Sequence, residues 1–245
     1  MPENVKKCIE SWKKCCPDYT IMEWNETNCD LDCCSYVREA YDAKKWAFVT
    51  DVIRLQVLVN YGGIYMDTDV EVLKSLDAFL PCEAVSGFET EKQLLTGFMA
   101  CKKAHPLFVE LLRSYDNAHF ILPDGSYDMT TNVKRVTDFC LKYGLQPNNT
   151  FQTINGLTIF PKEYFSPKDY ESETYTITEN THTIHHFDGS WLPDEDRLAL
   201  EMKRKYAQLM PRKIAAAIAR FQAAHQYRGF VAAIKEIWIR TIRHF

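Results

Sequence analysis

The chain has 245 residues, of which 46% are apolar and 25% are charged, and its net charge is −4. This length suits one sizeable α/β domain with a small addition, and this composition excludes a disordered chain. The sequence has no apolar run of membrane-spanning length, and "MPENVKKCIESWKKCC" lacks the apolar core of a signal peptide. We therefore expect a cytoplasmic protein.

Charge is distributed unevenly. Residues 197–245 carry 11 Lys+Arg and 2 Asp+Glu, a net charge of +9, which leaves 18 Lys+Arg and 31 Asp+Glu, or −13, for the rest. The carboxyl-terminal segment is therefore electrostatically distinct from the acidic part that precedes it.

Nine cysteines, an odd number that includes two adjacent pairs, are more typical of reduced thiols than of a disulfide framework. Cys29, Cys33 and Cys34 have the spacing for part of a zinc site, but no second pair of ligands follows. We expect free structural thiols.

The first quarter of the chain alternates helical and strand-like patterns. Residues 4–15 form an amphipathic helical pattern that Pro17 ends, and "YTIMEW" (19–24) alternates as a strand does. Residues 35–61 read as helix in one or two pieces, and within them "WAFVTDVIRLQVLVNY" is apolar on nearly every side and hence expected to be buried. Gly62 is placed where a helix ends in a left-handed residue, and "GIYM" then begins a strand.

Further strands are expected at 83–88, in "LTIFP" and in "YTITE", and helices at 104–116 and 130–143. A Pro-punctuated loop and "THTIHHFDGSW" close the acidic part, and a long basic helical stretch follows. This order predicts an α/β domain over residues 1–195 with a helical extension over 196–245.

The stretch "VNYGGIYMDTDVEVL" carries two aspartates next to a predicted strand end. In an extended chain Asp67 and Asp69 point to the same side, and two such carboxylates favour a cation between them. Oxygen ligands of this kind suit Mg²⁺ or Mn²⁺ together with a substrate's phosphates. The alternative is a turn with two solvated aspartates.

A second charged pair lies on the preceding helix. Asp51 and Arg54 are three residues apart, so they share one face of an otherwise apolar segment. Burying such a pair is costly unless it is satisfied or used. The pair is either an internal ion pair that fixes the helix or a part of the same site as the two aspartates.

The stretch "AFVTDVIRLQVLVNYGGIYMDTDVEVLKSL" resembles the signature of glycosyltransferases that have a DXD motif in their sugar-binding region. That family includes yeast-type initiating α-mannosyltransferases and bacterial capsule-associated transferases, with the clostridial glucosylating toxins as distant relatives. A looser similarity in sequence pattern to this family covers most of residues 4–191. It implies a GT-A-like α/β fold that binds a nucleoside-diphosphate sugar and a divalent cation.

By position, the resemblance implies that Asp51 and Arg54 hold the donor sugar. It implies that Tyr65 and Asp67 meet the ribose or the sugar, and that Asp69 ligates Mn²⁺ or Mg²⁺ together with Asp67.

The segment "HHFDGSW" matches the family's carboxyl-terminal loop, which completes the metal and diphosphate site. The resemblance implies His186 or His185 as a further metal ligand, and Ser190 and Trp191 as donors to the diphosphate. A structural role is the alternative for the two histidines.

The resemblance implies a metal-dependent retaining glycosyltransferase that uses a UDP- or GDP-sugar. The acceptor is expected to be a bacterial cell-surface polysaccharide or a lipid-linked sugar. No residue is identified as a covalent nucleophile, so we expect front-face displacement or no resolvable intermediate.

Family members usually begin with a strand of the type "IPKIIHYCWFG", which the chain lacks. We therefore expect the first strand of the nucleotide-binding sheet to be missing, which keeps a truncated, non-catalytic sugar-nucleotide or carbohydrate binder as the alternative. A chain extended by upstream codons is expected to melt higher and to bind donor better. An aspartate-nucleophile phosphohydrolase is less consistent, because Glu71 stands where its motif has Thr or Val.

The segment 211–245 has the pattern of a basic amphipathic helix, with Phe230, Val231, Ile234 and later apolar residues on one stripe. Such a helix lies peripherally on the inner face of a cell membrane, packs on the acidic domain, or mediates dimerisation. No nucleic-acid motif accompanies the charge, so nucleic acid is not expected as a partner.

Overall fold

The computed structural model describes residues 1–168, 174–189 and 192–235. It divides into two compact units, residues 1–187 and 188–245. The first unit is a mixed α/β structure, and the described part of the second is helical. Its elements, in chain order, are α1 (Glu3–Cys15), α2 (Ser35–Asp42), α3 (Trp46–Tyr61), β1 (Gly63–Met66), β2 (Val70–Val72), η1 (Asp77–Phe79), β3 (Ala84–Gly87), β4 (Phe98–Cys101), α4 (Pro106–Arg113), α5 (Asn132–Leu141), β5 (Gln152–Ile154), β6 (Leu157–Phe160), η2 (Lys162–Tyr164), β7 (Thr183–His185), α6 (Asp194–Ala207) and α7 (Arg212–Arg228).

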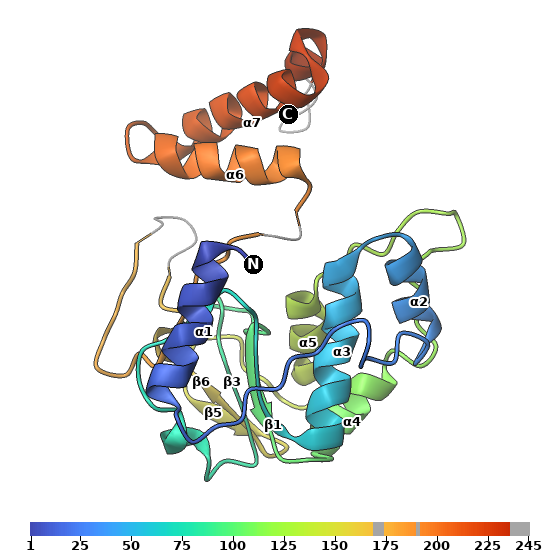
Figure 1. Ribbon diagram of the computed structural model, residues 1–245, viewed down its shortest axis with the longest axis vertical. Helices are drawn as coiled ribbons and strands as arrows, with labels where there is room; N and C mark the ends of the chain where they lie inside the picture. Colours follow the sequence, from blue (N-terminus) through green and yellow to red (C-terminus); the bar gives the residue numbers. More distant parts are fainter. Residues whose placement is uncertain (169–173, 190–191, 236–245) are drawn as a thin grey trace. The chain divides into compact units, whose positions relative to one another are not determined.

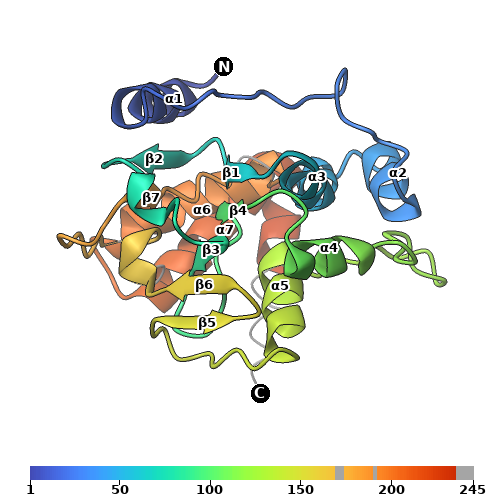
Figure 2. The same cartoon turned by 90° about the horizontal axis from the view of Figure 1, so that it is seen from below.

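The centre of the first unit is a five-stranded mixed sheet in the order β1-β4-β3-β6-β5. Strands β3 and β6 are parallel, and the other neighbours are antiparallel. Helices α3, α4 and α5 lie on one side of this sheet (Figures 1 and 2). A separate two-stranded sheet pairs β2 with β7.

Two hydrophobic cores form because side chains alternate across the strands. On β4, Met99 and Cys101 join the core under the helices, whereas Phe98 and Ala100 join the core on the opposite side. The first core contains most of the buried face of α3. The second is built around the stacked rings of Phe98 and Phe165, 4.2 Å apart.

The helices predicted over 4–15, 35–61, 104–116 and 130–143 are confirmed, with the long one split into α2 and α3 at a short turn. The strand predicted over 19–24 is wrong. The adjacent Ile21 and Met22 are both exposed, and no strand pairs with them among the described residues. A strand pattern needs a neighbouring strand to satisfy its backbone groups, and this segment has none there.

The strand predicted at "YTITE" is also wrong. Tyr175 makes one isolated bridge, with Lys168, and a turn at Thr178–Thr181 follows instead of a ladder. Four short strands were not predicted, namely β2, β4, β5 and β7. Each has only three or four residues, too few for a period-two pattern to be recognised.

Helix α1 covers the outer edge of β2 with side chains in place of a strand. The indole Nε1 of Trp12 donates to the carbonyl of Val70 at 2.6 Å, and the amide of Val72 donates to the hydroxyl of Ser11 at 2.8 Å. The thiol of Cys15 donates to the carbonyl of Val72 at 3.4 Å. These bonds satisfy backbone groups that an edge strand would otherwise leave open.

We expect Trp12→Phe to destabilise the protein by about 1–3 kcal/mol, because the buried carbonyl of Val70 loses its partner. Urea unfolding followed by circular dichroism measures the effect. Trp46→Phe is the matched control, since that side chain is about half exposed (49%) and should change little. Equal effects of the two substitutions would contradict the assignment.

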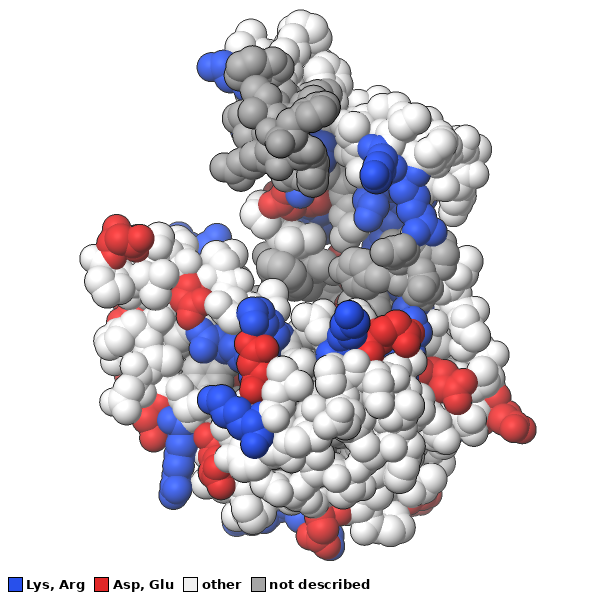
Figure 3. All heavy atoms as spheres, turned by 180° about the vertical axis from the view of Figure 1, so that it is seen from behind, with Lys and Arg blue, Asp and Glu red and all other residues white. Residues whose placement is uncertain are grey.

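Helices α6 and α7 make up most of the described part of the second unit. Its buried residues are alanines, namely Ala199 on α6, Ala215, Ala219, Ala223 and Ala224 on α7, and Ala233 beyond α7. Lys and Arg side chains gather on this pair in the space-filling view (Figure 3). Gly229, with φ 84°, ends α7, so the basic segment is not one continuous helix. The domain boundary at 195/196 stays a prediction, and α6 runs across that position.

Candidate active site

The site begins where α3 passes into β1. Gly62 has φ 72°, and a Cβ there would lie 2.6 Å from the backbone nitrogen of Lys103. Only glycine fits this combination of positive φ and close backbone approach. The expected helix end is therefore present, although ψ of −164° places it outside the left-handed helical region.

Asp67 and Asp69 lie in a tight turn between β1 and β2. The amide of Val70 donates to the carbonyl of Asp67 at 3.0 Å, which closes this turn. The expected extended geometry of the two aspartates is thus wrong. The turn nevertheless directs both carboxylates toward one side chain, which comes from a strand much later in the sequence.

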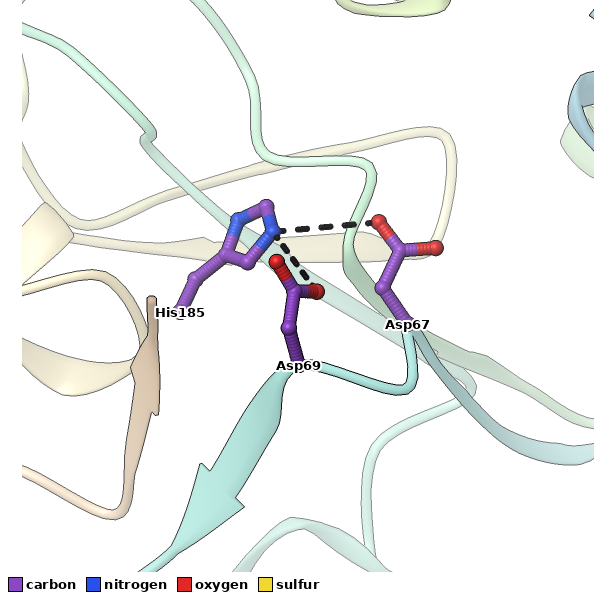
Figure 4. Close-up of side chains that lie close together, drawn as sticks. All are labelled: Asp67, Asp69 and His185. Carbon is purple, nitrogen blue, oxygen red and sulfur yellow. Dashed lines mark ion pairs between the residues drawn. The ribbon is translucent and has the colours of Figure 1, made fainter. Parts of the chain in front are cut away.

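That side chain is His185, the last residue of β7. Antiparallel pairing places His185 opposite Val70, directly beyond the turn. Its Nε2 lies 3.3 Å from Asp69 and 3.9 Å from Asp67 (Figure 4). The three groups offer ligand atoms within 4.8 Å of one another, and they are the one such cluster among the described residues.

The neighbouring His186 points elsewhere. Its Nε2 lies 3.0 Å from the carboxylate of Glu71, and its backbone amide donates to the carbonyl of Asp69 at 3.1 Å. Of the two histidines, the structure therefore brings His185 to the aspartates. Ser190 and Trp191 lie outside the described residues.

Arg54 connects the helix to the turn. Its guanidinium donates to Asp51 at 3.0 Å and to the carbonyl of Thr96 at 2.8 Å, and it lies 3.3 Å from Asp67. A further bond goes to the carbonyl of Thr50, at 3.2 Å. Nearly every N–H of this buried guanidinium is therefore occupied within the protein. Asp51 is bonded through Oδ1, which leaves its second oxygen for another donor.

Tyr65 completes this layer. Its hydroxyl donates to Oδ1 of Asp67 at 2.8 Å, and its ring lies 4.7 Å from the guanidinium of Arg54. Burial and the nearby carboxylate raise the pKa of Tyr65, so it remains a donor at neutral pH. Asp51, Arg54, Tyr65 and Asp67, from α3, β1 and the turn that follows, thus form one connected network.

Sequence reasoning missed Glu89, which follows β3. Burial, Asp67 and Asp69 raise its pKa to about 7 against the opposing effects of His185 and Arg54. Glu89 therefore lies close enough to interact electrostatically with the residues of this site. No motif marks it, and only its approach to residues far away in the sequence identifies it.

Negative charge exceeds positive charge at this site. Asp51, Asp67 and Glu89 all interact electrostatically with the buried guanidinium of Arg54, and Asp69 adds a fourth carboxylate. The pKa of His185 is lowered by burial, but Asp69, Asp67 and Glu89 outweigh that effect and raise it. Two carboxylates and an imidazole in an environment this acidic fit a divalent cation such as Mn²⁺.

Asp51 makes stability depend on pH. Burial, the largest cause, and Asp67 raise its pKa from 3.8 to about 6 against the opposing effects of Arg54 and Arg135. Between pH 4 and pH 6 the folded state keeps a proton that the unfolded state has lost, so stability falls as pH rises. We expect this loss to be about 1–3 kcal/mol and to be absent in Asp51→Asn. Urea unfolding from pH 4 to pH 7 measures the difference, and parallel curves for the two proteins would contradict it.

Gly97 provides the space in which His185 and Asp67 meet. A Cβ on Gly97 would lie 2.9 Å from Cε1 of His185 and 3.0 Å from Oδ2 of Asp67. Its carbonyl also accepts the backbone amide of Asp67, at 2.8 Å. The requirement is for space alone, because φ at Gly97 is not in the left-handed region.

We expect Gly97→Ala to lower Mn²⁺ affinity by roughly 10–100-fold, as displaced supporting groups do at metal sites. Titration calorimetry measures this change. Gly87→Ala is the control, since its Cβ would meet the ring of Phe165 at 2.8 Å, away from the aspartates. It should lower stability while leaving Mn²⁺ affinity unchanged, and the opposite pattern would count against the site.

Part of the chain that carries the two aspartates is similar in sequence to known proteins. Residues 2–86 match the family described as "Glycosyltransferase sugar-binding region containing DXD motif". The matched segment is similar to that sugar-binding region. It holds Asp51, Arg54, Tyr65, Asp67 and Asp69, whereas His185 and Glu89 lie beyond it.

Two curated fungal proteins are similar to the chain. The inositol phosphoceramide mannosyltransferase 3 of Schizosaccharomyces pombe is 26% identical over 133 residues, 48% of this chain and 36% of that protein. The mannosyl phosphorylinositol ceramide synthase CSH1 of Saccharomyces cerevisiae is 27% identical over 120 residues, 44% of this chain and 29% of that protein. The alignments thus span about a third of these relatives. No solved structure matches the chain.

Proposed function

We propose that the chain transfers a sugar from a nucleoside-diphosphate sugar to a glycan or lipid-linked acceptor, with the help of a divalent cation. The observation that carries the proposal is the convergence of Asp67, Asp69 and His185 beside the buried pair of Asp51 and Arg54. The match of residues 2–86 to a glycosyltransferase sugar-binding region supports it. A GT-A-like fold belongs to the same proposal and is compatible with the mixed α/β unit.

Asp67, Asp69 and His185 would hold the cation. The imidazole favours Mn²⁺ over Mg²⁺, because Mg²⁺ prefers oxygen ligands and water. When bound, the cation supplies Lewis-acid stabilisation of the departing diphosphate's charge. The bond of Asp67 to Tyr65 and its ion pair with Arg54 fix the orientation of its carboxylate.

Asp51 would receive a hydroxyl of the donor sugar on its second oxygen. Arg54 acts mainly by holding Asp51 and Asp67 in place, since its own donors are already engaged. From the sequence we expected both residues to hold the sugar directly. We now propose that Asp51 contacts the sugar and that Arg54 positions Asp51 and Asp67.

Glu89 is the candidate for the proton from the acceptor hydroxyl. A carboxyl with a pKa of about 7 is suited to take up and release a proton at neutral pH. Retention of configuration by front-face displacement remains part of the proposal.

Two fungal relatives carry mannosyl transfer and ceramide in their names. These names suggest a mannose donor and a lipid-linked acceptor as the first to test. A bacterial capsule acceptor is the other reading that the resemblance leaves open.

Titration calorimetry with UDP-glucose, UDP-galactose and GDP-mannose, each with and without Mn²⁺, tests the proposal. We expect one donor to bind only with Mn²⁺ and to be slowly hydrolysed. Affinity without turnover would favour the alternative of a non-catalytic sugar-nucleotide binder. A folded sample that binds neither Mn²⁺ nor any donor would overturn the proposal.

A peripheral membrane contact through 211–245 is a separate proposal, as is a location at the inner face of the cell membrane. Phe230, Val231 and Ile234 are exposed next to basic residues, and residues 236–245 lie outside the described part. No helix among the described residues is long and apolar enough to cross a membrane. Sedimentation with anionic vesicles at low salt tests the contact, and protein left in the supernatant would contradict it.

A further inference from the structure

The second ring nitrogen of His185 has no hydrogen-bond partner in the part of the chain that the structure describes. Nε2 faces Asp69 and Asp67 (Figure 4), whereas Nδ1 is buried and unpaired there. A histidine that binds a metal ordinarily donates its other ring N–H to a carboxylate, a carbonyl or a water molecule, and this bond fixes the orientation of the ring. No described protein group plays that part for His185, so packing has to hold the imidazole.

The ring of Phe187 packs against this imidazole. The two ring centroids are 4.0 Å apart, and the ring planes are tilted by 37°. Phe187 is buried, so the contact is shielded from water. The edge of the imidazole that carries Cε1 and Nδ1 faces Gly97, where a Cβ would lie 2.9 Å and 3.0 Å from these two atoms. An aromatic ring and the backbone of Gly97 therefore confine the imidazole.

Phe187 has a strained backbone in this position. Its φ is 57°, in the left-handed region, which a phenylalanine rarely adopts. Such strain persists only where the surroundings fix it, and it concentrates at functional sites. The ring of Phe187 lies 5.9 Å from Nζ of Lys168, which also donates to the carbonyl of His186 at 3.0 Å. Lys168 thus contacts both the ring and the backbone just before it, and the ring is held where it meets His185.

We propose that Phe187 is a positioning residue for the cation site. Its ring holds the imidazole of His185 in the orientation from which Nε2 reaches the cation between Asp67 and Asp69. The inference rests on the proposed function, since it requires that cation. A side chain that is ordered before its ligand arrives loses less conformational entropy on binding, which raises affinity. In this role Phe187 touches neither cation nor substrate and acts through His185.

Binding of Mn²⁺ to the full chain, measured by titration calorimetry, tests the proposal. Phe187→Leu keeps an apolar side chain but removes the ring, and we expect it to lower Mn²⁺ affinity about 10–100-fold, as the loss of an orienting group does at metal sites. Phe187→Tyr keeps the ring and should retain most of the affinity. Phe187→Met gives the same test as Phe187→Leu if the leucine variant does not fold.

Phe79→Leu is the matched control. Phe79 is buried like Phe187, and its ring lies 4.7 Å from that of His182, a histidine outside the cluster of possible metal ligands. Removing this ring should lower stability in urea unfolding and leave Mn²⁺ affinity unchanged. The control therefore separates a general loss of packing from a loss of orientation at His185.

A double-mutant cycle with His185→Ala shows whether Phe187 acts through the imidazole. In that background the two aspartates should still bind Mn²⁺ weakly, which electron paramagnetic resonance can follow, and Phe187→Leu should cause no further loss. An equal loss in both backgrounds, or unchanged affinity of Phe187→Leu in the natural background, would overturn the inference and leave the proposed function standing. A natural protein that binds no Mn²⁺ would overturn the proposed function, and this inference with it.

Discussion

Asp69→Asn is expected to lower Mn²⁺ affinity at least 100-fold and donor turnover by about 10²–10³-fold, a loss of the size seen when one charge-stabilising group is removed from an active site. The amide keeps the shape of the side chain but replaces a charged oxygen with a neutral one, 3.3 Å from Nε2 of His185. Titration calorimetry and donor hydrolysis measure the two effects.

Stability provides a second readout for the same variant. Without metal, Asp69→Asn should be at least as stable as the natural protein, because it removes one of several carboxylates that face one another. Glu71→Gln is the matched control, since its carboxylate contacts His186 and not the cluster. Unchanged affinity in Asp69→Asn, or an equal loss in Glu71→Gln, would contradict the placement of the metal.

Arg54→Met is expected to destabilise the protein by about 3–5 kcal/mol, because removing one partner of a buried ion pair leaves the other charge uncompensated. The guanidinium is 5% exposed and serves Asp51, Asp67 and two backbone carbonyls. Urea unfolding at pH 7 measures the loss. The loss should be smaller at pH 5, where Asp51, with a pKa of about 6, is mostly protonated.

The double variant Asp51→Asn/Arg54→Met keeps this prediction testable if the single variant does not fold. It should recover part of the stability, since the buried carboxylate is then neutral. Arg38→Met removes an exposed pair with Asp32 and should have only a small effect. A similar effect of Arg38→Met and Arg54→Met would show that the buried network is not the cause.

The sequence allowed the helices and the residues of the contiguous motif to be predicted. A helix period, a glycine pair and closely spaced acids are local features, and the structure places Asp51, Arg54, Tyr65 and Asp67 in one network. The turn geometry of the two aspartates was not foreseen, because a period-two argument assumes that the strand continues.

The parts of the site that could not be predicted depend on contacts between segments that are distant in the sequence. Consecutive residues of a strand face opposite sides, so only one of His185 and His186 meets the aspartates, and the register of β7 on β2 decides which. Glu89 and Gly97 belong to the hairpin between β3 and β4, and nothing local marks an acid that faces the site or a glycine that leaves space for it.

The pairing of β2 with β7 has a consequence for synthesis of the chain. Asp69 precedes His185 by 116 residues (185 − 69), which takes roughly 6–23 s to translate at about 5–20 residues per second. Throughout that interval the two aspartates exist without their imidazole partner, and β2 lacks its only strand neighbour among the described residues. Nascent chains that stop short of residue 185 thus carry the complete motif and still lack the assembled site.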